Sequence, residues 1–164
     1  MSTQFSVVLP LPDQAQWRPD DRNPHWWTLQ HRRSHSTIRI RAWRAARLVR
    51  PSECEEQARF WLPELPGLAP ETVLDERRLS SPEGYTTRLV VGVQPGDGER
   101  VEGFVLAFGA TVRRCLAMVF STDATGVGAT AEVGHRLRMA ADDVFGRARV
   151  RSVDDRVEQY RTAP

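Results

Sequence analysis

The sequence predicts a single α+β domain in which an antiparallel sheet of about six strands is sandwiched by helices on both faces. Two long runs, Arg100–Ala110 and Val112–Thr122, are apolar on both faces, as strands are when both sides of a sheet are covered. Residues 129–145 carry an apolar stripe with helical spacing. The length of 164 residues and the hydrophobic content of 40% suit one domain with one core.

The N-terminal third predicts short strands joined by loops. A first apolar strand, Phe5–Leu9, is stopped by Pro10, and the polar segment Gln14–Pro24 is expected to be a loop. Two extended runs then follow around a turn at Arg33–Ser36: Trp26–Arg32 and Thr37–Arg44.

The middle of the chain predicts a helix and a hairpin. The helix begins at Ser52, which forms a capping box with Glu55, and Pro63 ends its apolar stripe. After a Pro/Gly-rich loop, two further strands form the hairpin: Val73–Leu79 and Tyr85–Val93.

One domain is expected to span residues 1–164, with residues 1–4 and 155–164 as loosely ordered ends. Arg147–Val153 is predicted as a last edge strand and Ser152 as the start of a short terminal helix. The N-terminus lacks the apolar core of a secretory signal, and no apolar run is long enough to cross a membrane. The expected location is the cytoplasm; the alternative is an exported envelope protein whose leader has been removed.

Several segments follow one another in a characteristic order. They are an opening strand that ends in Leu9 and Pro10, Trp17 beyond it, the stretches ARFWLPELPG, PEGYTTRLVVGV and GFVLAFGATVRRCLAMVFST, and a closing helix. This order resembles the PsbP-like superfamily, which includes the photosystem II oxygen-evolving accessory protein, DcrB-like proteins and the Eag chaperones of type VI secretion effectors. The resemblance covers most of residues 5–150. It implies an α/β sandwich that acts in binding and assembly and carries no catalytic motif.

Residues 31–50 form the most basic segment, with seven arginines, two histidines and no acidic residue. Three apolar side chains of the predicted strand share one face: Ile38, Ile40 and Ala42. The opposite face carries Arg39, Arg41 and Trp43. Together with Arg44, these three are the candidate residues for binding a partner or an anion, because guanidinium groups neutralise anions and an indole ring stacks on bases.

Three interpretations of this basic face remain open. It is a solvated face paired with acids elsewhere in the fold, a surface for a protein or carboxylate partner, or a nucleic-acid site. All 23 basic residues are arginine, a bias typical of a GC-rich bacterial genome, so their abundance indicates no ligand by itself. The formal net charge of +2 disfavours a dedicated nucleic-acid domain. We therefore interpret the segment as half of an internal or partner-facing electrostatic match.

The cysteines and histidines form no recognisable metal motif. Cys54 and Cys115 form either a disulfide, which an oxidising compartment allows, or two separately buried thiols, which the sequence favours. His25, His31 and His35 are close in sequence but span a strand and a turn, and no nearby cysteine or acid completes a set. No metal site is predicted.

Motifs for catalysis or cofactor binding are weak. Residues 126–131 match the glycine pattern of a dinucleotide-binding turn, but the strands before them are predicted to be antiparallel. Adjacent acids diverge on their predicted helices: Glu55 and Glu56, Asp142 and Asp143, Asp154 and Asp155. We therefore predict that the protein is not an enzyme and uses no cofactor.

The leading functional prediction is a binding or assembly module, such as a secretion-effector chaperone or adaptor that holds a protein partner, with a homodimer as an option. One alternative is an accessory protein or lipoprotein domain of the cell envelope. The other is a binder of nucleic acid or another anion through Arg39, Arg41 and Trp43.

Overall fold

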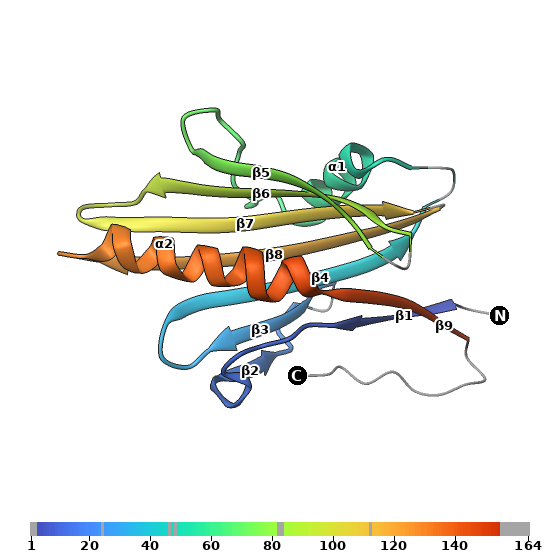
Figure 1. Cartoon of the computed structure of the whole chain (residues 1–164), viewed down its shortest axis with the longest axis horizontal. Coiled ribbons are helices and arrows are strands. Elements are labelled where there is room, and N and C mark those ends of the chain that lie inside the picture. The colour runs from blue at the N-terminus through green and yellow to red at the C-terminus, as the bar shows by residue number, and fades with distance from the viewer. Residues whose placement is uncertain are drawn as a thin grey trace.

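The computed structural model describes residues 3–23, 25–45, 47, 49–81, 84–111 and 113–154, and its main unit is a seven-stranded antiparallel sheet (Figure 1). The strands lie in the order β2 (Trp17–Asp20), β3 (Trp27–His31), β4 (His35–Arg44), β8 (Arg114–Thr125), β7 (Arg100–Thr111), β6 (Thr86–Pro95) and β5 (Val73–Ser80). The predicted antiparallel sheet is present, with one strand more than the six expected.

The additional strand is β2, which lies within the segment Gln14–Pro24 that was expected to be a loop. It is an edge strand that pairs only with β3, through residues such as Trp17 opposite His31. Pro19 is compatible with this position, because an edge strand leaves some backbone N–H groups without a ladder partner.

The two terminal strands form a small sheet of their own. β1 (Thr3–Val8) pairs antiparallel with β9 (Arg149–Asp154), from Thr3 opposite Asp154 to Val8 opposite Arg149. The last strand is therefore present near its predicted place, but it pairs with the first strand instead of the main sheet. Leu9 and Leu11, directly after β1, are buried in the same core cluster as Ile38 of β4. The terminal helix predicted from Ser152 lies largely outside the described residues.

Side chains of the central strands alternate between two cores, as their apolar pattern predicts. One core contains Val105 and Ala107 of β7 and lies beneath α2 (Ala129–Met139). The other contains Phe104, Leu106 and Phe108 and lies beneath α1 (Pro51–Trp61). We call these sides of the sheet the α2 face and the α1 face. Each face carries one helix of eleven residues over a sheet of seven strands. The predicted fold of helices packed on an antiparallel sheet is therefore confirmed, but two helices do not make the full sandwich that was expected.

Two glycines in the sheet leave room for a neighbouring side chain, one on α2 and one on the adjacent strand. Gly103 of β7 faces α2, and a Cβ atom there would lie 2.5 Å from Cγ1 of Val133. Gly92 of β6 is paired with Phe104, whose Cζ would lie 2.1 Å from an added Cβ. Both distances are well below van der Waals contact, so a larger side chain at either position displaces its neighbour.

The first helix begins differently from the prediction. α1 begins at Pro51, and the side chain of its N-cap residue, Arg50, makes no capping hydrogen bond. Proline suits the first helical position because its φ is fixed and it lacks the N–H that would be unpaired there. Glu55, the expected capping partner of Ser52, instead pairs with Arg88 on β6 at 2.9 Å.

The apolar stripe predicted over residues 129–145 is present, but its regular helix ends at Met139. A π-helical turn, Ala140–Val144, and a 3₁₀ turn, Phe145–Arg147, lead to β9. A Cβ atom at Gly146 would lie 2.6 Å from the carbonyl oxygen of Ala141, so glycine permits this tight exit. No helix in the described part of the chain is both long and apolar enough to cross a membrane.

Candidate functional site

The candidate residues of β4 follow the predicted alternation. Ile38 is buried in the core beneath α2, whereas Trp43 packs against the clusters beneath α1. Arg39 and Arg41 are half-buried, and Arg44 is exposed at the end of the strand, opposite Arg114. The four residues therefore lie along one strand but in different surroundings.

Arg41 is held by groups of its own chain. Its guanidinium carbon lies 3.6 Å from the centroid of the Trp61 ring on α1, which is the geometry of a cation–π contact. Its Nη1 donates a hydrogen bond to the backbone carbonyl of His25 at 3.1 Å. Burial lowers the pKa of the Arg41 guanidinium. No described carboxylate forms an ion pair with it. Arg41 is therefore a packing residue of the α1 face.

Trp43 is also engaged within the protein. Its Nε1 donates a hydrogen bond to Oε1 of Gln57 on α1 at 2.6 Å. Its ring meets Trp61 edge-to-face, with centroids 4.9 Å apart and an interplanar angle of 87°. The ring that was a candidate for stacking on a ligand is thus covered by α1.

Arg39 contributes to the field around an acidic group on the edge strand. Hydrogen bonds from Arg22 are the main cause that lowers the pKa of Asp20 to about 2, and the charge of Arg39 adds a smaller effect. The structure therefore divides the predicted basic face: Arg41 and Trp43 are joined through Trp61, while Arg39 lies within the field of Asp20.

A disulfide joins Cys54 and Cys115, with their Cα atoms 5.4 Å apart. The expectation of two separate thiols is therefore wrong. Cys54 lies in the first turn of α1 and Cys115 near the start of β8, and both are fully buried. The prediction failed because it treated each cysteine as an isolated core residue. In the folded sheet, α1 packs directly over β8, which brings the two sulfur atoms together.

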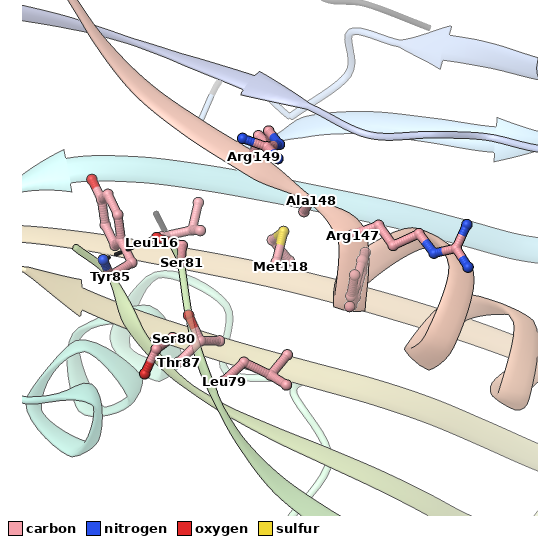
Figure 2. Close-up of a pocket in the computed structure, with 12 residues that line it drawn as sticks. Leu79, Ser80, Ser81, Tyr85, Thr87, Leu116, Met118, Arg147, Ala148 and Arg149 are labelled. Carbon is pink, nitrogen blue, oxygen red and sulfur yellow. Dashed lines mark hydrogen bonds between the residues drawn. The ribbon is translucent and has the colours of Figure 1, made fainter. Parts of the chain in front are cut away.

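A pocket of about 400 Å³ opens on the α2 face, between the β5–β6 hairpin, β8 and the turns after α2 (Figure 2). Figure 2 shows Tyr85 and Leu116 at one end, Arg147 at the other and Met118 between them. Most of the wall is apolar: Leu79, Tyr85, Leu116, Met118, Phe145 and Ala148. The volume falls within the range of about 300–1,000 Å³ that is usual for small-molecule sites.

The polar side chains of this pocket share one property, which is that each can donate a hydrogen bond. They are the hydroxyls of Ser80, Ser81 and Thr87, the phenol of Tyr85, and the guanidinium groups of Arg147 and Arg149. No acidic residue is among the described residues that line it. The pocket therefore presents donors and positive charge around an apolar interior.

Tyr85 forms the end wall of the pocket. It is 3% exposed, and its phenol oxygen is buried with no hydrogen-bond partner among the described residues. Burial raises the pKa of Tyr85 to about 12, against the opposing charge of Arg114. The backbone N–H of Tyr85 donates to Oγ of Ser81 at 3.0 Å, which fixes the tip of the hairpin.

Two of the three neighbouring histidines, His31 and His35, have separate side-chain partners. Nδ1 of His31 accepts hydrogen bonds from the backbone N–H groups of Arg33 and Ser34, and its Nε2 pairs with Asp13. His35 instead pairs with Asp123 through Nδ1, at 2.9 Å. The described residues contain no group of three histidine, cysteine or acidic side chains that could hold a metal ion.

The glycine turn before α2 follows an antiparallel strand. Both neighbours of β8 run antiparallel to it, whereas a dinucleotide-binding turn belongs to a parallel β-α-β unit. Gly126 and Gly128 have φ values of 90° and 82°, so they serve the backbone of a tight turn.

The chain is similar in fold to a solved structure. No protein family matches the sequence, and no curated protein matches it. Among solved structures, the chain is similar to LpqN of Mycobacterium tuberculosis, described as involved in cell envelope biogenesis, with a TM-score of 0.52 and 16% sequence identity. The similarity covers 90% of this chain and 84% of LpqN. The two proteins share an α/β fold built on a sheet.

A structure from Bacteroides thetaiotaomicron is similar over 92% of this chain and 46% of its own length, with 12% identity and a TM-score of 0.49. Membership in the PsbP-like superfamily stays a prediction, because no family match assigns the chain to it.

The pocket on the α2 face was not predicted from the sequence. Its walls come from β5, β6, β8 and the turns after α2, which are far apart along the chain. Tyr85 gives no local signal, because an aromatic residue in a predicted strand is equally typical of a core, and Tyr85 does belong to the core cluster beneath α2. The lining residues of the strands follow an ordinary apolar pattern. They line a pocket only because the turns after α2 bring the chain back over them.

Proposed function

We propose that this protein is a non-catalytic accessory module of the cell envelope that works in an oxidising compartment and binds a ligand or partner there. The observation that carries the proposal is the disulfide between Cys54 and Cys115. Such bonds persist in oxidising compartments and are rare among cytosolic proteins, where thiols are kept reduced.

Two further observations support the proposal. LpqN, which has a similar fold, is described as involved in cell envelope biogenesis. The pocket on the α2 face supplies a concave site of ligand size.

The competing prediction is a cytoplasmic chaperone or adaptor that holds a protein partner. Its apolar candidates are Phe60, Leu74 and Val127, which are 81%, 64% and 108% exposed. They lie on α1, on β5 and in the turn before α2, so they belong to three different elements. A cytoplasmic role also requires the two cysteines to be reduced.

The redox state of the cysteines in living cells tests the proposal. Cells of the source organism are quenched in acid, fractionated and treated with a maleimide polymer that adds mass to each free thiol. We expect the protein in the envelope fraction, unlabelled before reduction and doubly labelled after it. A protein found in the cytoplasm with both thiols labelled would overturn the proposal and favour the chaperone. The variant with Cys54→Ser and Cys115→Ser is the control, because it stays unlabelled under all conditions.

A further inference from the structure

The pocket on the α2 face has a chemical character that its lining residues define. Its floor is formed by Leu116 and Met118 of β8, which are both 2% exposed and belong to the large core cluster. Phe145 and Ala148 close it from the turns that lead to β9. An occupant must therefore present an apolar body to this floor, because a polar group there would lose its hydration without gaining a partner.

The rim carries positive charge. Arg147 and Arg149 line the pocket from the segment after α2, and the charge of Arg114 reaches the phenol of Tyr85 at the opposite end. The nearest described acid of this segment, Asp143, lies 4.0 Å from Arg147, and both side chains are more than half exposed. Such an ion pair is weak in water and leaves most of the donors of Arg147 available.

Thr87 adds a buried polar group. It is 8% exposed and lines the pocket. The hydroxyl lies directly over Gly109 of β7, where an added Cβ would be 2.7 Å from Oγ1. The phenol oxygen of Tyr85, which lines the same pocket, is buried without a hydrogen-bond partner among the described residues, so a ligand atom that accepts its hydrogen bond would remove the cost of that burial.

From this combination we infer that the pocket on the α2 face binds a small apolar molecule that carries one carboxylate. The apolar body lies against Leu116 and Met118. The carboxylate lies among the donors, because every polar side chain of the pocket donates and none is acidic. A cationic ligand of the same length finds no counter-charge in the described lining.

Titration of the purified, oxidised protein with three molecules of equal chain length tests the inference. They are octanoate, octan-1-ol and octylammonium, and binding is followed by isothermal titration calorimetry. We expect saturable binding of one octanoate per chain, about ten-fold tighter than octan-1-ol, because the charge-assisted hydrogen bond is absent from the alcohol. Octylammonium should not bind.

Variants locate the site. Arg147→Gln should weaken octanoate binding about five-fold or more through the loss of a charged donor, and Ala148→Phe should abolish it by filling the pocket from its rim. Arg138→Gln is the matched control, because Arg138 is an exposed arginine of α2 that does not line the pocket. Should Ala148→Phe fail to fold, Thr87→Val serves instead, since it removes the hydroxyl and keeps the shape of the side chain.

Three outcomes would overturn the inference: no saturable octanoate binding, equal affinity for octanoate and octan-1-ol, or octanoate binding that these variants leave unchanged. The inference adds a ligand class to the binding role proposed above, yet the two tests fail separately. If the titration fails, the carboxylate ligand is excluded, but the redox result still supports the envelope role. If the thiols are found reduced in the cytoplasm, the envelope role is excluded, but the titration result still holds.

Discussion

At the scale of single residues, Arg41 is a charged side chain that packs within the fold, against Trp61 of α1. Its guanidinium lies over the ring of Trp61, and its Nη1 donates a hydrogen bond to the backbone carbonyl of His25. An arginine in this position contributes dispersion and cation–π energy to the packing of the α1 face. Arg44, on the same strand, has no such cover.

Replacing Arg41 and Arg44 in turn separates these roles. Arg41→Ala should lower the free energy of unfolding by about 1–2 kcal/mol, because it removes the contact with Trp61. Arg44→Ala should change it by less than about 0.5 kcal/mol, as exposed substitutions usually do. Urea denaturation followed by tryptophan fluorescence measures both. Equal losses in the two variants would contradict the packing role of Arg41.

Glycine positions give a second comparison of single residues. Gly92→Ala should destabilise the protein by about 1–3 kcal/mol, because the new methyl group collides with the ring of Phe104. Gly134→Ala, in α2, meets no atom within 4 Å and should stabilise it by about 0.5–1 kcal/mol, since alanine favours a helix. Thermal unfolding of the two variants checks the opposite signs.

At the scale of elements, Asp123 of β8 links three neighbouring strands. It accepts hydrogen bonds from Arg100 of β7, at 2.7 Å, and pairs with His35 of β4 at 2.9 Å. Burial alone would raise the pKa of Asp123, but the hydrogen bonds and charges of Arg100 and His35 outweigh it and lower the pKa.

This pairing predicts a pH dependence. A carboxylate whose pKa is depressed in the folded state stabilises that state above its ordinary pKa, and the stabilisation is lost as the pH falls through the folded value. The wild-type protein should therefore lose more free energy of unfolding between about pH 4 and pH 2 than Asp123→Asn. Guanidinium denaturation at several pH values measures the two slopes, and parallel curves would count against the link.

At this scale, the periodic pattern of single strands is predictable from the sequence, whereas contacts between distant elements are not. The alternation in β4 and the two-sided apolar pattern of β7 and β8 are present, because a period of two is set by the strand backbone itself. β2 was missed because an edge strand needs only one paired side and can contain Pro19. The disulfide and the pocket were missed because both depend on which elements the fold brings together. Neither Cys54 nor Tyr85 carries that information locally.

At the scale of the whole molecule, the disulfide links the helix of the α1 face covalently to a central strand of the sheet. It joins α1 to β8 across 61 residues, so it restricts the unfolded chain more than a short loop would. By the chain-entropy estimate, a loop of this length contributes about 4 kcal/mol of stability.

Removal of the bond tests this coupling. The double variant with Cys54→Ala and Cys115→Ala should unfold roughly 10 °C below the oxidised protein, given about 2–4 °C per kcal/mol for a domain of this size. Differential scanning calorimetry measures the shift. A reducing agent should move the wild type toward the variant and leave the variant unchanged. An unchanged melting temperature would show that the bond contributes nothing to the folded state.

The same bond limits how far the chain can be stretched. Residues between the two cysteines form a closed ring, so only the chain outside the 61-residue span lengthens when both ends are pulled. The fully extended oxidised chain reaches about 360 Å, against about 570 Å after reduction, at about 3.5 Å per residue. A pore that admits one extended strand passes the reduced chain and stops at the ring. The oxidised chain can therefore pass such a pore only after the bond has been reduced.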